Sequence, residues 1–343
     1  MKIAIDCRSL GMSGIGVYLE NVLLYITQDT SNEFLLIGNK DKIMSFDIKA
    51  KHTILPCDIK PFSFKEILLF PSKIINSCDV FYTPNYNIPG GINIPIYSTI
   101  HDVVFLDIKG LTNRLGYLIR KLMLKRAFIL SKHIFTVSEF SRSRIQHFFG
   151  NAKPITVAYN GIRAELLNLK NIEPSKYKFS YLIFVGNMKK YKGLDILLDA
   201  IKNTDKRLVV IGASSNMRTV DRRIYNLLAH NPNVILEGTV SNAELYSLIK
   251  GAEALIQPSR YEGFGIPPLE ALYIGTPVIL SDIPVFKEVY KSMPVSFFKD
   301  GDSNDLHKNL LSLQRQGCDI ELIKRQFSYK VTAQAILSTI FTR

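Results

Sequence analysis

The chain of 343 residues is long for a single hydrophobic core and suits two domains of ordinary size. Its apolar share of 47% and charged share of 21% are those of a folded globular protein, which excludes a largely disordered chain. The formal net charge of +13 predicts a polyanionic partner, and nucleotide diphosphates, an anionic membrane surface and nucleic acid all qualify.

The N-terminal residues enter a strand-like run, 2–6, without a basic and apolar signal region. No apolar run reaches the length of about 18 residues that a membrane span needs. The four cysteines are scattered, with neither a C-x-x-C pair nor a histidine cluster near them: Cys7, Cys57, Cys78 and Cys318. These features predict a cytoplasmic protein with no disulfide framework and no zinc site.

The N-terminal half alternates strand-like runs with helical patterns, which is typical of a parallel sheet with crossover helices. Strands are predicted at 3–5, 34–37, 53–55, 79–82, 96–100, 133–137 and 155–158. A glycine loop, Gly11-Met-Ser-Gly14-Ile-Gly16, separates the first strand from a helix, and such a loop brings backbone N–H groups to an anion. A tight turn without a ligand is the alternative. The glycine order differs from G-x-G-x-x-G, so NAD binding is not predicted.

Polar pairs follow two of these strands directly. His101-Asp102 comes after the strand that ends at Ile100, and Ser138-Glu139 comes after the strand that ends at Val137. Ligands of open parallel sheets bind at the carboxyl ends of the strands, so both pairs are predicted at the ligand edge. His101 is therefore a candidate catalytic residue.

A helix predicted at 112–131 is amphipathic. Its apolar positions are Leu115, Leu118, Ile119 and Leu122, and its cationic positions are Arg114, Lys121, Lys125 and Lys132. The cationic stripe indicates either a solvated face or an electrostatic contact with anionic lipid headgroups. Aromatic residues are not interleaved along the stripe in a way that would stack bases, which disfavours nucleic acid.

A polar, lysine-rich linker reaching to about residue 179 leads into a second alternating series. Strands are predicted at 181–185, 208–211, 234–236, 254–256, 278–280 and 295–298, and helices from 194 and at 217–228, 242–249, 305–315 and 330–341. The two halves share a plan of strand, glycine loop and helix, without a detectable sequence repeat. We therefore predict two Rossmann-like domains.

The stretch 257–282 reads as strand, glycine loop, helix and strand. Pro267 and Pro268 suit the first turn of the helix, which places Glu262 on the loop and Glu270 about one turn into the helix. A helix N-terminus is a ready site for phosphate, and carboxylates beside it suit sugar hydroxyls. A nucleotide-sugar, which has both parts, is the predicted ligand.

These motifs resemble those of glycosyltransferase family 4, whose members are retaining enzymes of the GT-B fold. Glu262-Gly-Phe-Gly-Ile-Pro-Pro-Leu-Glu270 looks like the family's E-x7-E signature, and 185–193 is similar to its diphosphate loop. Gly14-Ile-Gly16-Val-Tyr18 is similar to its N-terminal glycine loop. His101-Asp102, 136–141 and 159–161 also stand where the family has such residues.

The resemblance implies an α/β protein of the GT-B fold, with two facing Rossmann-like domains, parallel sheets and an interdomain cleft. It implies an acceptor-binding domain at 1–165 and a nucleotide-sugar-binding domain at 166–325. A C-terminal helix at 326–343 is a candidate for packing back on the N-terminal domain.

Carried over residue by residue, the resemblance implies that Glu270 binds the ribose hydroxyls and that Glu262 binds hydroxyls of the transferred sugar. The backbone N–H groups of Phe264 and Gly265 would lie near that sugar. Lys192 would neutralise the diphosphate.

In the other domain, the loop amides from Gly14 to Gly16 would approach the same diphosphate. His101 would sit beside the sugar, and Asp102 would orient that histidine or the acceptor.

The chain departs from the family at Asn187, where many members have an arginine. Lys189 or Lys190 is the candidate for the second cation of this loop. We count Asn187 and Lys189 among the donor-binding residues, and the choice between the two lysines stays open.

The resemblance implies a retaining hexosyltransferase that moves a sugar from a nucleotide-sugar to a glycan or lipid-linked glycan, in O-antigen or capsule-type polysaccharide biosynthesis. The expected location is cytoplasmic, with the inner face of the membrane as a candidate peripheral site. No D-x-D motif accompanies a sugar-binding loop, so neither a metal nor a cofactor is expected, and nucleic acid is not an expected partner. The alternatives are a GT-B nucleotide-sugar epimerase and, from another class, a basic nucleic-acid-binding protein.

Overall fold

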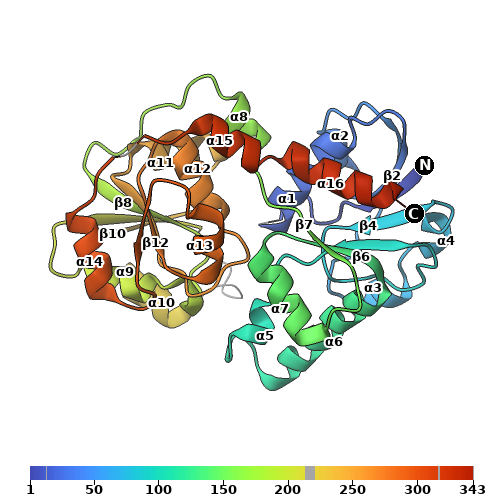
Figure 1. The fold of residues 1–343 in the computed structure, drawn as a ribbon, viewed down its shortest axis with the longest axis horizontal. Helices are drawn as coiled ribbons and strands as arrows, with labels where there is room; N and C mark the ends of the chain where they lie inside the picture. Colours follow the sequence, from blue (N-terminus) through green and yellow to red (C-terminus); the bar gives the residue numbers. More distant parts are fainter. Residues whose placement is uncertain (13, 213–220, 316, 343) are drawn as a thin grey trace. The chain divides into compact units, whose positions relative to one another are not determined.

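The computed structural model describes residues 1–12, 14–212, 221–315 and 317–342, and its contacts divide the chain into two compact units (Figure 1). Unit 1 comprises Met1–Ala164 and Phe327–Arg343. Unit 2 comprises Glu165–Gln326. The acceptor-binding and donor-binding roles assigned to the two halves, and the cleft between them, stay predictions.

Unit 1 contains a seven-stranded sheet in the order β3-β2-β1-β4-β5-β6-β7, and every neighbouring pair is parallel. Its strands are β1 (Lys2–Asp6), β2 (Glu33–Gly38), β3 (Lys51–Pro56), β4 (Val80–Thr83), β5 (Ile96–Thr99), β6 (Ser131–Thr136) and β7 (Ile155–Val157). The central strands are buried on both faces, which explains their continuous apolar runs in the sequence.

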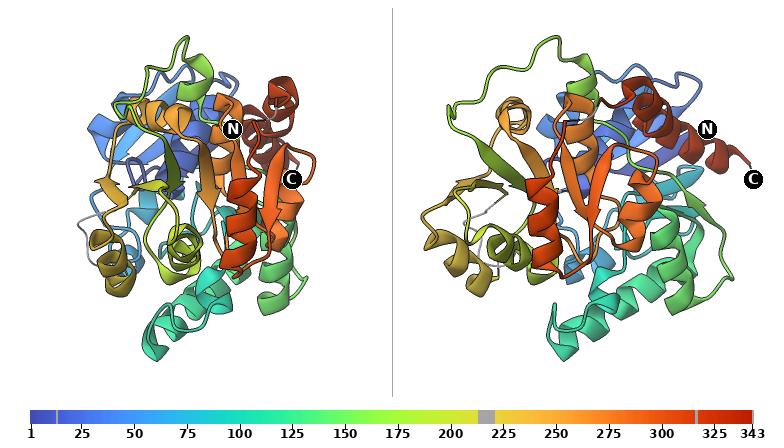
Figure 2. Two further views of the ribbon diagram at one scale, coloured as in Figure 1. Left: turned by 90° about the vertical axis from the view of Figure 1, so that its left-hand side faces the viewer. Right: turned by 60° about the vertical axis from the view of Figure 1, so that its left-hand side comes forward.

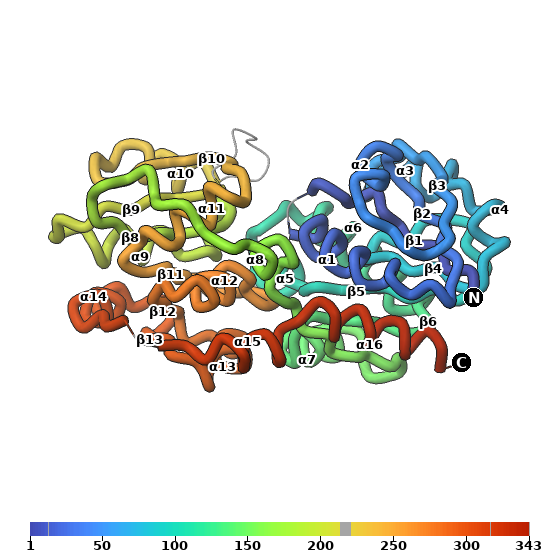
Figure 3. The backbone as a smooth tube through the Cα atoms, turned by 90° about the horizontal axis from the view of Figure 1, so that it is seen from above, coloured from blue at the N-terminus to red at the C-terminus, as the bar shows by residue number. Residues whose placement is uncertain are grey.

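The helices of unit 1 cover both faces of this sheet. They are α1 (Ile15–Ile26), α2 (Lys40–Met44), α3 (Phe64–Leu68), α4 (Ser72–Ile75), α5 (Val104–Asp107), α6 (Arg114–Leu130), α7 (Glu139–Phe149) and α16 (Tyr329–Phe341). The short helix α8 (Ala164–Asn168) begins at the last residue of the first segment of unit 1 and continues into unit 2. Side chains of α4, α6 and α7 join one apolar core with the strands. The C-terminal helix α16 returns to unit 1 and packs along α1 (Figures 1 and 3).

Unit 2 contains a six-stranded parallel sheet in the order β10-β9-β8-β11-β12-β13. Its strands are β8 (Tyr181–Val185), β9 (Arg207–Ile211), β10 (Val234–Gly238), β11 (Ala254–Gln257), β12 (Val278–Ser281) and β13 (Val295–Phe298). The helices are α9 (Leu194–Ile201), α10 (Arg222–Ala229), α11 (Asn242–Gly251), α12 (Ile266–Ile274), α13 (Pro284–Tyr290), α14 (Ser303–Leu311) and α15 (Ile320–Gln326), with a 3₁₀ turn η1 (Lys190–Lys192).

The strands of unit 2 lie between two groups of helices, α9, α10 and α14 on one side and α11, α12 and α15 on the other (Figure 2). In both sheets the chain starts at a central strand, builds outward to one edge, and then crosses back to build the other edge. The reversal lies between β1 and β4 in unit 1 and between β8 and β11 in unit 2. Loops at such a reversal are where doubly wound sheets bind ligands.

Three sequence-based elements differ from the structure. Of the helix predicted at 217–228, residues 217–220 lie outside the described residues, and α10 begins at Arg222 after the cap residue Asp221. The helix predicted at 305–315 is α14, which begins at Ser303 because the side chain of Asp302 accepts hydrogen bonds from Asn304 N at 3.1 Å and Asp305 N at 3.0 Å.

On α6, the four apolar positions named from the sequence are exposed, and the side chains that pack on the sheet are Leu124, Ala127 and Phe128. Within the described ranges, helices long and apolar enough to span a membrane are absent.

Candidate active site

Two loops meet at the reversal point of the unit 2 sheet. One follows β8 and spans 186–193, and the other follows β11 and spans 258–265. The backbone N–H of Arg260 donates to the carbonyl of Tyr191 at 2.8 Å. Gly193 has a φ of 70°, and a Cβ atom there would lie 1.9 Å from the carbonyl oxygen of Pro258. A glycine is therefore required for the two loops to approach each other.

An ion pair joins the same two loops. Lys192 Nζ lies 2.7 Å from Glu262 Oε1, and each side chain is 12% exposed. The same carboxylate oxygen accepts hydrogen bonds from Ser259 Oγ at 2.7 Å and from Gln257 Nε2 at 3.2 Å. Glu262 is thus held in one orientation by three donors. Its partner Lys192 lies near the end of the loop 186–193, which we call the lysine loop.

The second carboxylate of the signature lies on α12. Gly265 precedes this helix with a φ of 94°, and a Cβ atom there would lie 2.6 Å from the ring of Phe286. The helix has no side-chain cap at its N-terminus. Glu270, one turn further on, is 1% exposed. Gly265 therefore allows the N-terminus of α12 to lie next to the loop that carries Glu262.

Tyr290, on α13, is buried near both carboxylates. Its hydroxyl donates to the carbonyl of Gly265. Burial raises the pKa of Tyr290, and the negative charges of Glu262 and Glu270 raise it further. Both carboxylates are therefore within electrostatic reach of one buried hydroxyl group.

Three residues of this arrangement were not predicted from the sequence as site residues: Gln257, Ser259 and Tyr290. The first two could have been predicted, because they lie at or just after the carboxyl end of β11. His101 was predicted in unit 1 from the same kind of position after a strand. Tyr290 lies on α13, a helix that was not predicted, and no motif marks this residue.

The lysine loop presents a polar side chain where many family members have an arginine. Among the described residues, Asn187 Oδ1 is one of the buried side-chain atoms that have no hydrogen-bond partner. Lys189 is half-buried and Lys190 is exposed. The side chain of Phe264 is 2% exposed, so a ligand would meet its backbone. Which lysine supplies the second cation stays a prediction.

The glycine loop of unit 1 also lies at a reversal point. Gly14 precedes α1 with a φ of 51°, which favours glycine. A Cβ atom on Gly16 would lie 2.6 Å from the carbonyl oxygen of Ser9. Both glycines are needed to bring the N-terminus of α1 close to the end of β1.

His101 follows β5 and packs against this part of unit 1. Its Nε2 lies 2.9 Å from the carbonyl oxygen of Pro84, which can only accept, so Nε2 carries the proton. The ring meets the edge of Tyr18 with centroids 4.7 Å apart. Part of its surface is exposed, yet burial lowers its pKa to about 4. The imidazole is therefore neutral near pH 7, with Nδ1 left as an acceptor.

The polar residues around His101 form hydrogen bonds that fix the turn at residues 101–104. Asp102 Oδ1 accepts a hydrogen bond from the N–H of Val104 at 3.0 Å. Ser138 caps α7 by accepting from Ser141 N at 3.0 Å, and Ser141 Oγ donates to the carbonyl of His101 at 2.9 Å. The structure thus gives Ser138 a capping role.

The lowered pKa of His101 predicts a pH-dependent stability. The imidazole takes a proton near pH 6.5 in the unfolded chain and only near pH 4 in the folded protein. The free energy of unfolding should therefore fall as the pH falls from about 6.5 to 4, by at most about 1.4 kcal/mol per pH unit.

Urea unfolding at several pH values, compared between wild type and His101→Gln, measures this contribution. The variant should show the shallower loss of stability, because it lacks this proton uptake on unfolding. Equal slopes in the two proteins would contradict the prediction.

Over the described ranges, no group of three or more His, Cys, Asp or Glu side chains could hold a metal ion. The metal independence inferred from the sequence stays a prediction.

Two family models match the chain. The model described as glycosyl transferases group 1 matches residues 168–324, and the model described as Glycosyltransferase Family 4 matches residues 72–166. The first covers the site around Lys192 and Glu262, and the second covers His101.

Curated relatives carry related descriptions. The O-antigen chain mannosyltransferase RfbU of Salmonella typhimurium is 32% identical over 173 residues, which is 49% of this chain and about half (47%) of the length of that protein. The capsular polysaccharide biosynthesis glycosyltransferase CapM of Staphylococcus aureus is 28% identical over 288 residues, which is 76% of this chain and 74% of CapM.

Solved structures share the fold. HepE of Anabaena, solved in complex with UDP and glucose, superposes with a TM-score of 0.76 at 16% identity, and the match covers 100% of both chains. This likeness, with the two parallel sheets, shows the GT-B fold that the sequence analysis predicted. The two family models together extend over most of the sequence, and the chain belongs to the glycosyltransferases of family 4 type.

Proposed function

We propose that the protein transfers a sugar, with retention of configuration, from a nucleotide-sugar to a glycan or lipid-linked glycan. The observation that carries the proposal is the pair Lys192–Glu262 at the reversal point of the unit 2 sheet, beside the N-terminus of the helix that carries Glu270. A cation, a helix N-terminus and two carboxylates suit the diphosphate and the hydroxyls of such a donor.

Each residue has a role in this proposal. Lys192 stabilises the charge that develops on the departing diphosphate, Glu262 holds hydroxyls of the transferred sugar, and Glu270 holds the ribose. The departing phosphate oxygen takes the proton of the acceptor hydroxyl on the same face of the sugar. No carboxylate forms a bond to the sugar, so the two glutamates are not a glycosidase pair.

His101 acts at the sugar as a neutral group in this proposal. Its Nε2–H is occupied by the Pro84 carbonyl, so Nδ1 is the ring atom that remains to accept a hydrogen bond from a sugar hydroxyl. Asp102 stabilises the turn that carries His101 by accepting a hydrogen bond from the N–H of Val104. The alternative, that Asp102 orients the acceptor, rests on the family resemblance alone.

The pathway and location are proposed from the relatives. RfbU and CapM are described as enzymes of O-antigen and capsular polysaccharide synthesis, which supports a role in surface polysaccharide assembly. HepE was solved with UDP, which supports a nucleotide-sugar donor without deciding the base for this chain. The four free cysteines suit the cytoplasm, and we place the enzyme at the inner face of the membrane.

Two measurements test the function. A panel of nucleoside diphosphates and nucleotide-sugars should contain a ligand that raises the Tm, since a ligand that binds only the folded state stabilises it. The donor so identified should be consumed faster with a glycan acceptor than alone. A new sugar isomer formed from the donor alone would instead support the epimerase, and the absence of any Tm shift across the panel would contradict the donor site.

We also predict that transfer does not depend on a divalent cation. Lys192 and the helix N-terminus supply the positive charge that a metal ion provides in other transferases. Activity should persist in excess EDTA. Loss of activity in EDTA, with recovery on adding Mn²⁺ or Mg²⁺, would show that the prediction is wrong.

A further inference from the structure

Exposed apolar side chains gather in two segments of unit 1. Of the 21 large apolar side chains that are exposed in the described part of the chain, 12 lie in these segments. Six belong to the first segment: Phe62, Phe64, Ile67, Leu68, Leu69 and Ile74. Six belong to the second: Leu115, Leu118, Ile119, Leu122, Ile129 and Leu130. Soluble proteins scatter such residues singly, so this concentration marks an interaction site.

The helix α6 has two apolar faces. Successive residues of an α-helix are turned by about 100°, so Leu115, Leu118 and Leu122 lie on one side and Leu124 lies opposite Leu115. Leu124 is 1% exposed, whereas Leu115 is 66% and Leu122 is 56% exposed. One face therefore packs on the sheet, and the leucines of the outward face are each at least 50% exposed in the described part of the chain.

The two segments border one loop. The N–H of Gly90 donates to the carbonyl of Glu66, on α3, at 3.2 Å. Arg126, on α6, donates from its guanidinium to the carbonyls of Ile88 at 3.4 Å and Pro89 at 3.2 Å. The helices α3 and α6 thus both contact residues 88–90, and Figure 1 shows them near each other in unit 1.

The first segment is held in place by buried polar groups. The carboxylate of Glu66 accepts from Arg8, from Asn87 Nδ2 at 2.5 Å and from the N–H of Phe62 at 3.0 Å. Arg8 is also paired at 2.7 Å with Asp6, the last residue of β1. The outward side chains Phe64 (83% exposed) and Leu68 (81% exposed) are therefore presented by an anchored helix.

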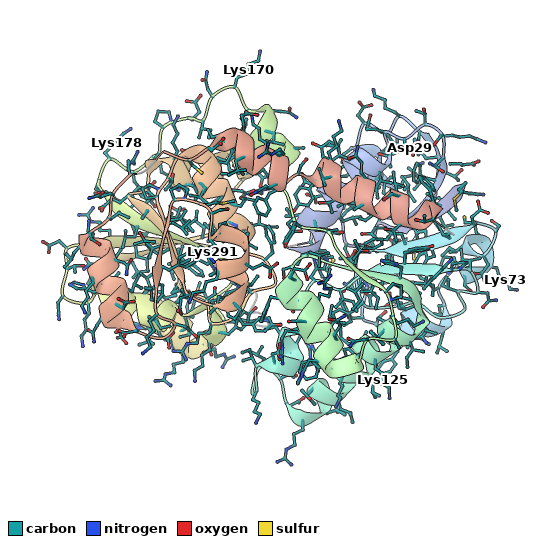
Figure 4. The ribbon with its side chains drawn as sticks, in the orientation of Figure 1. Asp29, Lys73, Lys125, Lys170, Lys178 and Lys291 are labelled. Carbon is teal, nitrogen blue, oxygen red and sulfur yellow. The ribbon has the colours of Figure 1, made fainter. Side chains whose placement is uncertain are left out.

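Cations accompany the apolar residues. Helix α6 contains no acidic residue and five basic ones: Arg114, Arg120, Lys121, Lys125 and Arg126. By the same helical geometry, Arg114, Lys121 and Lys125 follow one flank of the outward apolar face. Figure 4 shows Lys125, and Lys73 of α4, at the periphery of unit 1.

The charge of the chain is concentrated in the same unit. Unit 1 has 22 of the 43 lysine and arginine residues and 12 of the 30 acidic residues, a net charge of +10 against +3 for unit 2. An apolar strip with a cationic flank is the pattern of a helix that lies in the interface of an anionic bilayer.

We propose that residues 62–74, which include α3 and part of α4, form a docking surface together with α6. The 12 apolar residues above define this surface, which inserts into the headgroup region of an anionic lipid bilayer. The apolar side chains enter the boundary between headgroups and acyl chains, and the lysines contact the phosphates. The proposal rests on the membrane location proposed above and is independent of the transfer chemistry, because no donor-site residue belongs to the docking surface.

The test measures co-sedimentation of the full chain with vesicles of phosphatidylcholine alone and with vesicles of equal parts phosphatidylcholine and phosphatidylglycerol. Wild type should bind the anionic vesicles more tightly. Leu118→Ser with Leu122→Ser should weaken that binding about tenfold or more, because two apolar side chains no longer insert. Leu311→Ser, at an exposed leucine of unit 2, is the matched control and should bind as wild type does.

A second double variant, Lys121→Glu with Lys125→Glu, separates charge from insertion. It should lose the preference for anionic vesicles. Circular dichroism and the Tm verify that each variant is folded, and a retained Tm shift with the donor-site ligand shows that the proposed function survives in it.

Wild type that fails to sediment with anionic vesicles overturns the docking proposal, while leaving the donor site intact if the ligand still raises the Tm. Leucine variants that bind vesicles as wild type does also overturn it. A dimer that becomes monomeric in the leucine variants, with vesicle binding unchanged, would identify the surface as an interface between two copies of the chain.

Discussion

Replacing Lys192 by alanine is expected to lower kcat by about 100- to 1000-fold, or roughly 3–4 kcal/mol of transition-state stabilisation. Lys192 is the cation of the loop 186–193, and its Nζ lies 2.7 Å from Glu262 Oε1. Charge develops on the diphosphate only as the bond to the sugar breaks. The loss should therefore fall on kcat more than on the KM of the donor.

A matched variant, Lys291→Ala, removes an exposed lysine of unit 2 that takes no part in the site (Figure 4). Its kcat should match that of wild type. Since Glu262 keeps the hydrogen bonds from Ser259 and Gln257 in Lys192→Ala, the variant should stay folded, and its Tm verifies this. A folded Lys192→Ala protein with kcat within a few fold of wild type would remove Lys192 from the proposed mechanism.

The fold was predictable because its signals are local and repeated. Each central strand, such as Tyr181–Val185, is a continuous apolar run that both faces of a parallel sheet require. Short helices such as α13 and α15, of seven residues each, have no such periodicity over a useful length, and they were not predicted.

The apolar pattern of α6 shows a further limit. From the sequence, Leu115, Leu118, Ile119 and Leu122 form the evident apolar face, yet the sheet packs against Leu124, Ala127 and Phe128. A hydrophobic pattern tells which side chains avoid water, but it does not tell which surface covers them. The exposed face became visible only once the packing was known.

The site was partly predictable. Motif spacing found Lys192, Glu262 and Glu270, and the structure brings the first two into direct contact. Motif spacing could not find Tyr290, because its contact with the carbonyl of Gly265 joins a helix and a loop that approach each other only in the folded protein. Sequence position also placed Ser138 at the ligand edge without showing that its hydroxyl is used as a helix cap.

The two signature glutamates should respond differently to the same substitution. Glu262→Gln is expected to lower kcat by about 10- to 100-fold, because Glu262 would contact the sugar whose bond breaks. Glu270→Gln is expected to raise the KM of the donor by about tenfold or more with kcat nearly unchanged. The ribose lies away from the reacting bond, so its hydrogen bonds stabilise ground state and transition state alike.

Steady-state kinetics with varied donor concentration, for both variants and for Glu173→Gln as an exposed control in unit 2, separate the two effects. Glu262 loses its negative charge beside Lys192 in the first variant, so that lysine becomes free to pair with the diphosphate. Its donor affinity should therefore hold or rise while kcat falls. The reverse pattern, with KM raised in Glu262→Gln and kcat lowered in Glu270→Gln, would exchange the sugar and ribose roles of the two carboxylates.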